Sequence, residues 1–401
     1  MNKKIVVTGI IIILGLGLFG GGFFVGQKSI VCETCPPSDV NFSLFWEAWN
    51  LLKEKYGKQE DLKTQDMIYG AISGMVDSLK DPHTVFMPPE DSKKFLEDVG
   101  GRFEGVGMEI GVRKGQLQII APLEGTPAKK AGLRSGDKII KINEIMSADV
   151  SLDKAVSIIR GPKGSEVVLI IMRDGWDEAK EFKIKRDIIE VPSLRWKLIS
   201  SATGKEDENG DIVYISLYQF SEKIDSDFTK EAFKILNSPA EKIILDLRNN
   251  PGGYLQRAQD IAGWFLKEGQ IVTTEDFYGK KPQIIYKAKG NSEFENYPMV
   301  ILINQGSASA AEILAAALRD NRGVKIIGEK SFGKGSVQEL EGMNDGSNLK
   351  ITVGGWLTPN GVQINELGLE PDIKVEMTEN DYQEEKDPQL EKAIEIIKEI
   401  R

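Results

Sequence analysis

The chain has 401 residues, of which 41% are hydrophobic and 28% are charged, a composition typical of globular proteins with room for two or three domains. Its formal net charge is -10 at pH 7, and no block of lysine and arginine interrupts this acidic background. Because phosphate binding needs a basic surface, the charge argues against nucleic acid as a partner.

The N-terminus carries an apolar segment. Lys3 and Lys4 precede the segment, and residues 5–26 contain no charged side chain. As a helix this segment would be ~33 Å long, about one hydrocarbon core, and the lysines favour a cytoplasmic N-terminus. We expect a retained transmembrane anchor, with the chain after Gln27 in a periplasm or at the outer cell surface. A cleaved signal peptide is the alternative, although the apolar run is long for one.

Residues 27–40 form a short linker that contains both cysteines of the chain, Cys32 and Cys35. No second Cys-x-x-Cys and no nearby histidine completes a zinc site, so the sequence argues against a metal. In an oxidising compartment we expect a disulfide, either local or between the two subunits of a homodimer.

Residues 41–99 have a helical pattern with an aromatic stripe at spacings of three and four. We expect this stripe to be a helix-packing face rather than a ligand site. A second helix is expected near residues 65–79, ended by the turn Asp81-Pro82-His83. The stripe consists of Phe42, Phe45, Trp46, Trp49 and Leu52.

Residues 100–187 predict a small strand-rich module. Strands are expected over residues 106–112, 117–121, 137–142 and 166–173, and short helices over 127–131 and 152–159.

Two motifs of this module resemble a PDZ domain. Residues 105–110 read Gly-Val-Gly-Met-Glu-Ile and are similar to its carboxylate-binding loop and the strand after it. Residues 126–137 are similar to its second motif, Ser/Thr-Pro-Ala-x-x-Ala-Gly-Leu-x-x-Gly-Asp. Glycines can expose successive backbone N–H groups to a terminal carboxylate, and the following strand edge can pair with an extended peptide. The alternative is that the glycines only shape a turn. The residues expected to bind a substrate tail are Gly105, Val106, Gly107 and Met108.

Residues 188–376 alternate strands and helices, the pattern of an α/β core. Residues 377–401 are charged with one apolar stripe, which predicts a packing or interface helix. Core strands are expected over residues 212–218, 242–247, 299–303, 325–328 and 350–356, and helices over 228–236 and 254–266.

Ser309 is the candidate nucleophile, because it stands where a strand is followed by a helix. Such a turn can expose a hydroxyl and point backbone N–H groups at an oxyanion. Small neighbours leave room for a peptide carbonyl. Ser307 is the candidate helix cap. The only histidine, His83, lies far upstream in a turn and is expected to be structural rather than a base.

Lys334 is the candidate general base, because a desolvated lysine amine can lose its proton near neutral pH. It lies between two glycines that allow close backbone packing. Lys330 competes for the role, but Glu329 beside it would favour its charged form. Gln338 follows a few residues later, and its neutral amide could orient the amine without holding it protonated.

The loop Asn249-Asn250-Pro251-Gly252-Gly253 follows a buried strand and can present a backbone N–H to an oxyanion, with the N–H of Ala310 as its partner. The sequence leaves the choice between Gly252 and Gly253 open.

Together these motifs resemble the carboxyl-terminal processing peptidases, tail-specific proteases of the S41 serine peptidase family. The resemblance runs from about Phe42 to Val375. It rests on the segments 81–84, 247–253, 306–312, 332–335 and 369–373 and on the PDZ motifs.

The resemblance implies a multidomain α+β and α/β protein, in which a PDZ domain precedes a core similar to the crotonase and ClpP-like spiral. It implies Ser309 as nucleophile, Lys334 as base and Gln338 as orienting residue. It also implies cleavage of protein substrates near exposed, often apolar C-termini, and no metal or other cofactor.

Two other readings remain open at this stage. A membrane-tethered PDZ scaffold with an inactive core would bind peptides without turnover. A protease of the HtrA type would need a histidine base and a catalytic domain placed before the PDZ domain, which fits this chain badly.

Overall fold

The computed structural model describes residues 40–113, 115–123, 125–134, 136–150, 152–173, 175–190, 192–365, 367–378, 380–381, 384 and 386–400. The expected anchor, residues 5–26, and both cysteines lie outside these ranges. Among the helices within them, none has the length and apolar character needed to cross a bilayer. The chain divides into two compact units, residues 1–70 and 71–401, which are described separately.

In the first unit, α2 (Ser43–Lys55) is followed by the short helix η1 (Gln59–Asp61) and the start of α3 (Thr64–Asp77). The aromatic stripe lies on and just before α2, and its rings contact one another, with Phe45 and Trp46 centroids 5.2 Å apart. Within the described residues of the first unit, Trp46 is 55% exposed and no residue of α2 is buried, so the packing of the stripe against another helix stays a prediction.

The second unit begins with the end of α3, then β1 (Val85–Met87) and α4 (Pro89–Val99). The region of residues 41–99, expected to be helical, therefore also contains the short strand β1. This strand pairs antiparallel with β18 (Asn348–Leu357), with Val85 opposite Lys350. Burial of Phe86 and Met87 overrides the helical pattern of the flanking sequence.

The PDZ-like module is a sheet of order β3-β4-β5-β7-β8, with β6 paired to β5. Its first strand, β3, is an edge strand. A two-stranded ribbon, β2 with β9, joins the two ends of the module across the expected boundary at residue 187. The elements are β2 (Arg102–Gly105), β3 (Met108–Arg113), β4 (Gln116–Pro122), α5 (Pro127–Lys130), β5 (Lys138–Ile142), β6 (Ile145–Met146), η2 (Ser147–Asp149), α6 (Leu152–Ile159), β7 (Glu166–Met172), β8 (Lys180–Lys185) and β9 (Asp187–Glu190).

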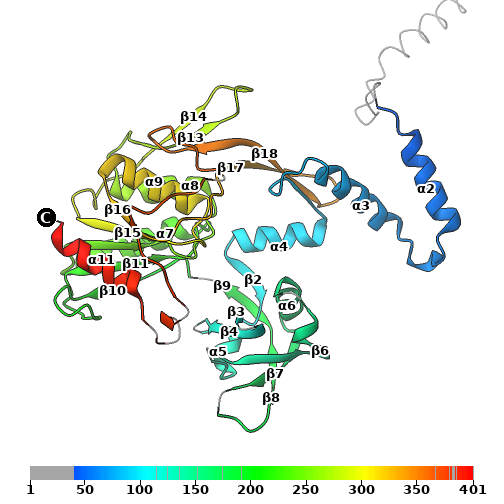
Figure 1. Ribbon diagram of the computed structural model, residues 1–401, viewed down its shortest axis with the longest axis horizontal. Coiled ribbons are helices and arrows are strands. Elements are labelled where there is room, and N and C mark those ends of the chain that lie inside the picture. The colour runs from blue at the N-terminus through cyan, green and yellow to red at the C-terminus, as the bar shows by residue number, and fades with distance from the viewer. Residues whose placement is uncertain are drawn as a thin grey trace, which may run out of the picture. The chain divides into compact units, whose positions relative to one another are not determined.

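The α/β core contains a six-stranded sheet of order β10-β11-β12-β15-β16-β19, parallel except for β10 (Figure 1). The alternation of apolar runs and amphipathic stretches fits this topology, because the crossovers from β11 to β12, from β12 to β15 and from β15 to β16 each contain a helix. The elements are β10 (Leu194–Ile199), β11 (Ile212–Leu217), α7 (Ile224–Leu236), β12 (Lys242–Asp246), α8 (Leu255–Phe265), β15 (Met299–Ile303), α9 (Ala310–Arg322), β16 (Lys325–Gly328), β19 (Ile373–Lys374) and α11 (Pro388–Glu399).

A second, antiparallel sheet holds β1, β18, β13 (Ile271–Asp276) and β14 (Ile284–Lys287) in that order, with β17 (Ser336–Gly342) also paired to β18. Only β18 had been expected from the sequence. β13 and β17 carry Thr, Glu and other polar side chains that interrupt any apolar run, and β1 and β14 are only three and four residues long.

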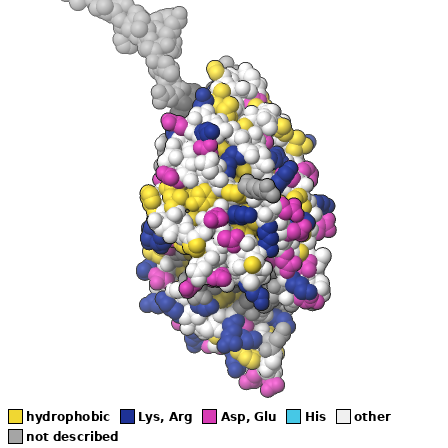
Figure 2. All heavy atoms as spheres, turned by 90° about the vertical axis from the view of Figure 1, so that its left-hand side faces the viewer, with side chains coloured by type: hydrophobic (Ala, Val, Ile, Leu, Met, Phe, Trp, Pro, Cys, Tyr) yellow, Lys and Arg dark blue, Asp and Glu magenta, His cyan; other side chains and the backbone are white. Residues whose placement is uncertain are grey.

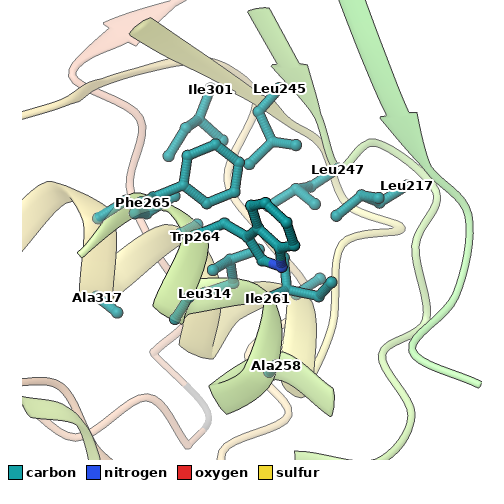
Figure 3. Packing of buried hydrophobic residues seen from close by; sticks show 14 of the residues in the cluster. Leu217, Leu245, Leu247, Ala258, Ile261, Trp264, Phe265, Ile301, Leu314 and Ala317 are labelled. Atoms are coloured by element: carbon teal, nitrogen blue, oxygen red, sulfur yellow. The ribbon is translucent and has the colours of Figure 1, made fainter. Parts of the chain in front are cut away.

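Helices α8 and α9 pack on one face of the six-stranded sheet. Figure 3 shows Trp264 and Phe265 of α8 and Leu314 of α9 against Leu245 and Ile301 of the strands, and all five are buried. Burial of one such side chain contributes about 1.5–3 kcal/mol. This packing fixes the strand ends from which the site described below is built.

A separate hydrophobic cluster is formed by residues of the six-stranded sheet and of α11. The expected C-terminal packing helix is therefore present. Arg248 joins this helix to the core through Asp246 (2.7 Å) and Asp387 (2.8 Å). Burial alone would lower the pKa of Arg248, but the two carboxylates raise it, so the guanidinium remains charged. On the face seen in Figure 2, acidic and basic side chains are interspersed over most of the surface.

Candidate active site

The turn between β15 and α9 presents Ser309 as the N-cap residue of α9. Its backbone lies at φ 55° and ψ −117°, a conformation that L-residues rarely adopt and that indicates stored strain. Ser307 is not the cap that the sequence suggested. It is buried, and its Oγ donates to the Leu247 carbonyl (2.7 Å) and accepts from the Asn304 N–H (3.0 Å). Ser307 therefore holds the turn that exposes Ser309.

Glu312, in the first turn of α9, joins this turn to the loop that carries Lys334. Oε2 accepts from the N–H of Ser309 (2.8 Å) and from the N–H of Lys334 (3.0 Å). Oε1 accepts from the Ser331 hydroxyl (2.5 Å) and the Gly333 N–H (2.8 Å). Burial raises the pKa of Glu312 while these donors lower it. The three backbone N–H groups can only donate, so they favour the ionised carboxylate, whereas burial disfavours it.

Sequence reasoning missed Glu312. The signal that could have found it is the spacing Ser309-x-x-Glu312 at the start of an apolar helix, the pattern of a capping box.

Lys334 lies in the loop before β17 and lines the same cavity as Ser309. Burial lowers the pKa of its amine, and the nearby charge of Glu312 opposes this effect. Gly335 allows the close packing that buries the loop, since a Cβ there would lie 2.0 Å from the Asn365 nitrogen. Lys330 instead points to an exposed ion pair with Glu370 (2.8 Å).

Gln338, on β17, also lines the cavity. Its Nε2 donates to the Ser336 hydroxyl at 2.6 Å, so the hydrogen bond recorded for its side chain is to Ser336 rather than to Lys334. His83 donates its backbone N–H to Asp81 (2.9 Å) and is not among the residues that line the cavity.

The loop after β12 brings two glycines against the Ser309 turn. A Cβ on Gly252 would lie 2.7 Å from the Ser309 Cβ and 2.9 Å from the Ala310 nitrogen. The Gly252 N–H donates to the Asn250 side chain (2.9 Å). Among the described residues no acceptor is recorded for the N–H of Gly253 or of Ala310. The geometry therefore favours Gly253 over Gly252 as the donor that pairs with Ala310.

The cavity has a volume of about 540 Å³ and combines these polar groups with an apolar wall. At one side the Tyr286 hydroxyl donates to Glu275 (2.9 Å), and burial together with this carboxylate raises the pKa of Tyr286 to about 12. The apolar lining comes from α4, α9 and the second sheet and includes Phe95, Leu96, Ile313, Val337 and Trp356.

The predicted tail-binding loop lies between β2 and β3 of the PDZ-like module. Val106 is buried, and its carbonyl accepts from the Ala128 N–H (2.8 Å). The Gly107 carbonyl accepts from the Thr126 hydroxyl (2.8 Å), and at φ +76° a Cβ on Gly107 would lie 2.5 Å from Thr126. These contacts fix the conformation of the loop. The strand β3, which begins at Met108, pairs only with β4 within the described sheet.

Comparison with known families matches three segments of the chain. Residues 31–91 match the N-terminal domain of the activating protease CtpB, residues 96–172 match the PDZ domain, and residues 211–375 match peptidase family S41.

Among curated relatives, the carboxy-terminal processing protease CtpB of Bacillus subtilis is 35% identical over 94% of this chain and 78% of its own length. The carboxy-terminal-processing protease of Bartonella bacilliformis is 39% identical over 78% of this chain and 70% of its own length.

Among solved structures, the photosystem II D1 C-terminal processing protease superposes with a TM-score of 0.54 at 27% identity, covering 83% of this chain and 92% of that protein. A putative S41 protease of Bacteroides fragilis, 16% identical with a TM-score of 0.60, shares the fold over 91% of this chain and 99% of that protein. The chain therefore belongs to peptidase family S41, as a carboxy-terminal processing serine protease with a PDZ domain.

Proposed function

We propose that this protease hydrolyses peptide bonds with a Ser309–Lys334 dyad, and that its PDZ module selects substrates by their C-terminal tails. The observation that carries the dyad is the carboxylate of Glu312, which accepts from the backbone N–H of both residues and so ties the two loops to one cavity. Burial, which lowers the pKa of Lys334, supports its role as a base.

The proposed reaction runs through an acyl-enzyme. The neutral amine of Lys334 takes the Ser309 proton as Oγ attacks the scissile carbonyl. The N–H groups of Gly253 and Ala310 stabilise the resulting oxyanion, each with about 2.7–4 kcal/mol as for known donors. The protonated Lys334 then gives its proton to the leaving amine, and water, deprotonated by Lys334, hydrolyses the ester. Gln338 would orient the amine after turning from Ser336.

Tail selection is supported by the edge position of β3 and by the fixed conformation of the loop at Gly107. An extended tail would add as a further strand along β3, and the loop would hold its terminal carboxylate. Cleavage would then occur near the end of the bound chain. The core is proposed to correspond to the crotonase and ClpP-like spiral.

The test uses the Ser309→Ala chain and two peptides with the same apolar sequence, one with a free C-terminal carboxylate and one with an amide. We expect the amide to bind at least about tenfold more weakly, because a charge-assisted hydrogen bond is lost. Fluorescence anisotropy measures both affinities. A wild-type digest of a protein with the same tail should show new C-termini near its end by intact mass. Equal affinities would contradict tail recognition.

We further propose that residues 5–26 anchor the protease in the cell membrane, with the catalytic core outside the cytoplasm. The proposal rests on the uncharged length of that segment and on the lysines before it. After fractionation and carbonate washing, the full chain should remain with the membranes, and a chain starting at residue 27 should be soluble. A full-length chain in the soluble fraction would contradict the anchor, and a soluble chain shortened by that segment would mean that the segment is cleaved.

A further inference from the structure

The cavity that contains Ser309 and Lys334 is also lined by a buried acidic residue, Glu275. Glu275 lies on β13, directly opposite Trp356 of β18, and is only 6% exposed. Its Oε2 accepts from the Tyr286 hydroxyl (2.9 Å). Among the described residues no donor is recorded for its Oε1. Because a carboxylate can accept about four hydrogen bonds, most of the capacity of Glu275 is left for a molecule bound in the cavity.

The carboxylate of Glu275 has no cation beside it. Within the described part of the chain no ion pair is recorded for Glu275, and Tyr286 supplies one hydrogen bond but no charge. The other glutamate that lines the cavity, Glu339, lies 3.9 Å from Lys281. Burial of a charge is costly unless the charge is paired. A cation carried by a bound substrate would complete the pair at Glu275.

The two lysines that line the cavity do not supply that cation. Lys350 lies six residues before Trp356 on β18, about 20 Å away along an extended strand, whereas Glu275 lies directly opposite Trp356. The loop of Lys334 is nearer, because the Gly335 carbonyl accepts from the Trp356 N–H (2.7 Å). In its proposed role as the base, however, Lys334 acts as a neutral amine. The carboxylate therefore lies close to the catalytic loop and remains unpaired.

The walls of the cavity suit the stem of a basic side chain. Phe95, Ile313, Val337 and Trp356 give the cavity an apolar lining. Lysine and arginine bury their aliphatic stems along such surfaces while the charged head reaches a polar partner. The Tyr286 and Trp356 rings lie beside Glu275 with their centroids 5.9 Å apart, and aromatic rings also attract cations.

We propose that Glu275 is a specificity-determining residue, which selects substrates with lysine or arginine at one of the two residues joined by the scissile bond. The aliphatic stem packs on the apolar lining, and the charged head pairs with the carboxylate. An acidic side chain is disfavoured, because it would bring a second carboxylate to the same site. This inference rests on the proposed nucleophile, Ser309, which places the scissile bond in the cavity of Glu275.

The first test needs only the wild-type enzyme. The scissile bond of the tail-bearing protein is located by intact mass, and each of the two residues that it joins is changed in turn to Lys, Met and Glu. Lysine and methionine have stems of similar length, so their comparison isolates the charge. At one of the two positions, kcat/KM should be at least about tenfold higher for Lys than for Met, and lowest for Glu. Equal values for Lys and Met at both positions would overturn the inference.

The second test changes the carboxylate. Glu275→Gln keeps the shape and removes the charge, so kcat/KM should fall for the Lys substrate and stay nearly unchanged for the Met substrate. Glu275→Asp keeps the charge and should keep the preference for a basic residue. The matched control is Asp276→Asn, which changes the net charge equally at the next residue of β13, on the opposite face of the strand. It should leave the Lys-to-Met ratio unchanged.

Thermal unfolding confirms that each variant is folded. An unchanged Lys-to-Met ratio in folded Glu275→Gln would contradict the role of Glu275, as would an equal fall of this ratio in Asp276→Asn.

The outcomes separate this inference from the proposed function. Cleavage by Ser309→Ala would overturn the proposed nucleophile, whereas a lysine preference that is lost in Glu275→Gln would still support the selection by Glu275. Loss of cleavage in Ser309→Ala, together with a wild-type Lys-to-Met ratio near one, would leave the proposed function standing and overturn the inference.

Discussion

Ser309→Ala is expected to reduce kcat to the background of the assay, a loss on the order of 10⁶-fold as for the nucleophile of other serine proteases. The physical reason is that no other side chain at the turn presents a hydroxyl to the cavity, since Ser307 is buried and hydrogen-bonded to Leu247. The measurement is the rate at which new C-termini appear on the tail-bearing protein, with thermal unfolding as a check on folding.

Lys334→Ala is expected to have a similar effect, and Lys334→Arg tests the reason. Arginine keeps the length and charge but stays protonated, so it cannot take the Ser309 proton. Lys330→Ala is the matched control, because Lys330 lies in the same loop and forms an exposed ion pair that contributes little. Substantial activity in Lys334→Arg would show that another group is the base.

The wild-type enzyme should gain activity with rising pH at values below the ordinary lysine range. The sign follows from burial, which lowers the pKa of Lys334 and so populates the neutral amine at lower pH.

Gly252→Ala is expected to lower kcat/KM by about 100-fold, because a displacement near 1 Å in a catalytic group costs about that much. The new Cβ would lie 2.7 Å from the Ala308 carbonyl oxygen and from the Ser309 Cβ, and 2.9 Å from the Ala310 nitrogen. Two of these are backbone atoms, so relief requires the loop of Gly252 and the turn of Ser309 to move apart.

The matched control is Gly269→Ala, which separates steric contact from backbone strain. Gly269 has φ +86° and Gly252 has φ +94°, so both substitutions place alanine in an unfavourable conformation that costs about 1–3 kcal/mol of folding free energy. No atom lies within 4 Å of the Cβ position at Gly269. Comparable losses of activity in both variants would mean that strain alone accounts for the effect.

The sequence by itself determined the elements with strong local signals. The buried strands at residues 299–303 and 325–328 and the helix at residues 152–159 have the bounds that were expected, because apolar periodicity and turn residues mark them locally. The family was also determined at this level, because several short motifs occur together in one order. The sequence alone also identified the candidate residues Ser309, Lys334 and Gln338, whose roles remain proposals.

Only the tertiary structure decided how these motifs meet. β1, β13 and β17 each pair with β18. Such pairing between segments distant in the sequence leaves no periodic signal in the sequence of either strand. The choice of Gly253 over Gly252 depends on which N–H already donates to Asn250. Lys350 enters the cavity through the register of β18, far in sequence from Ser309, so no local motif could reveal it.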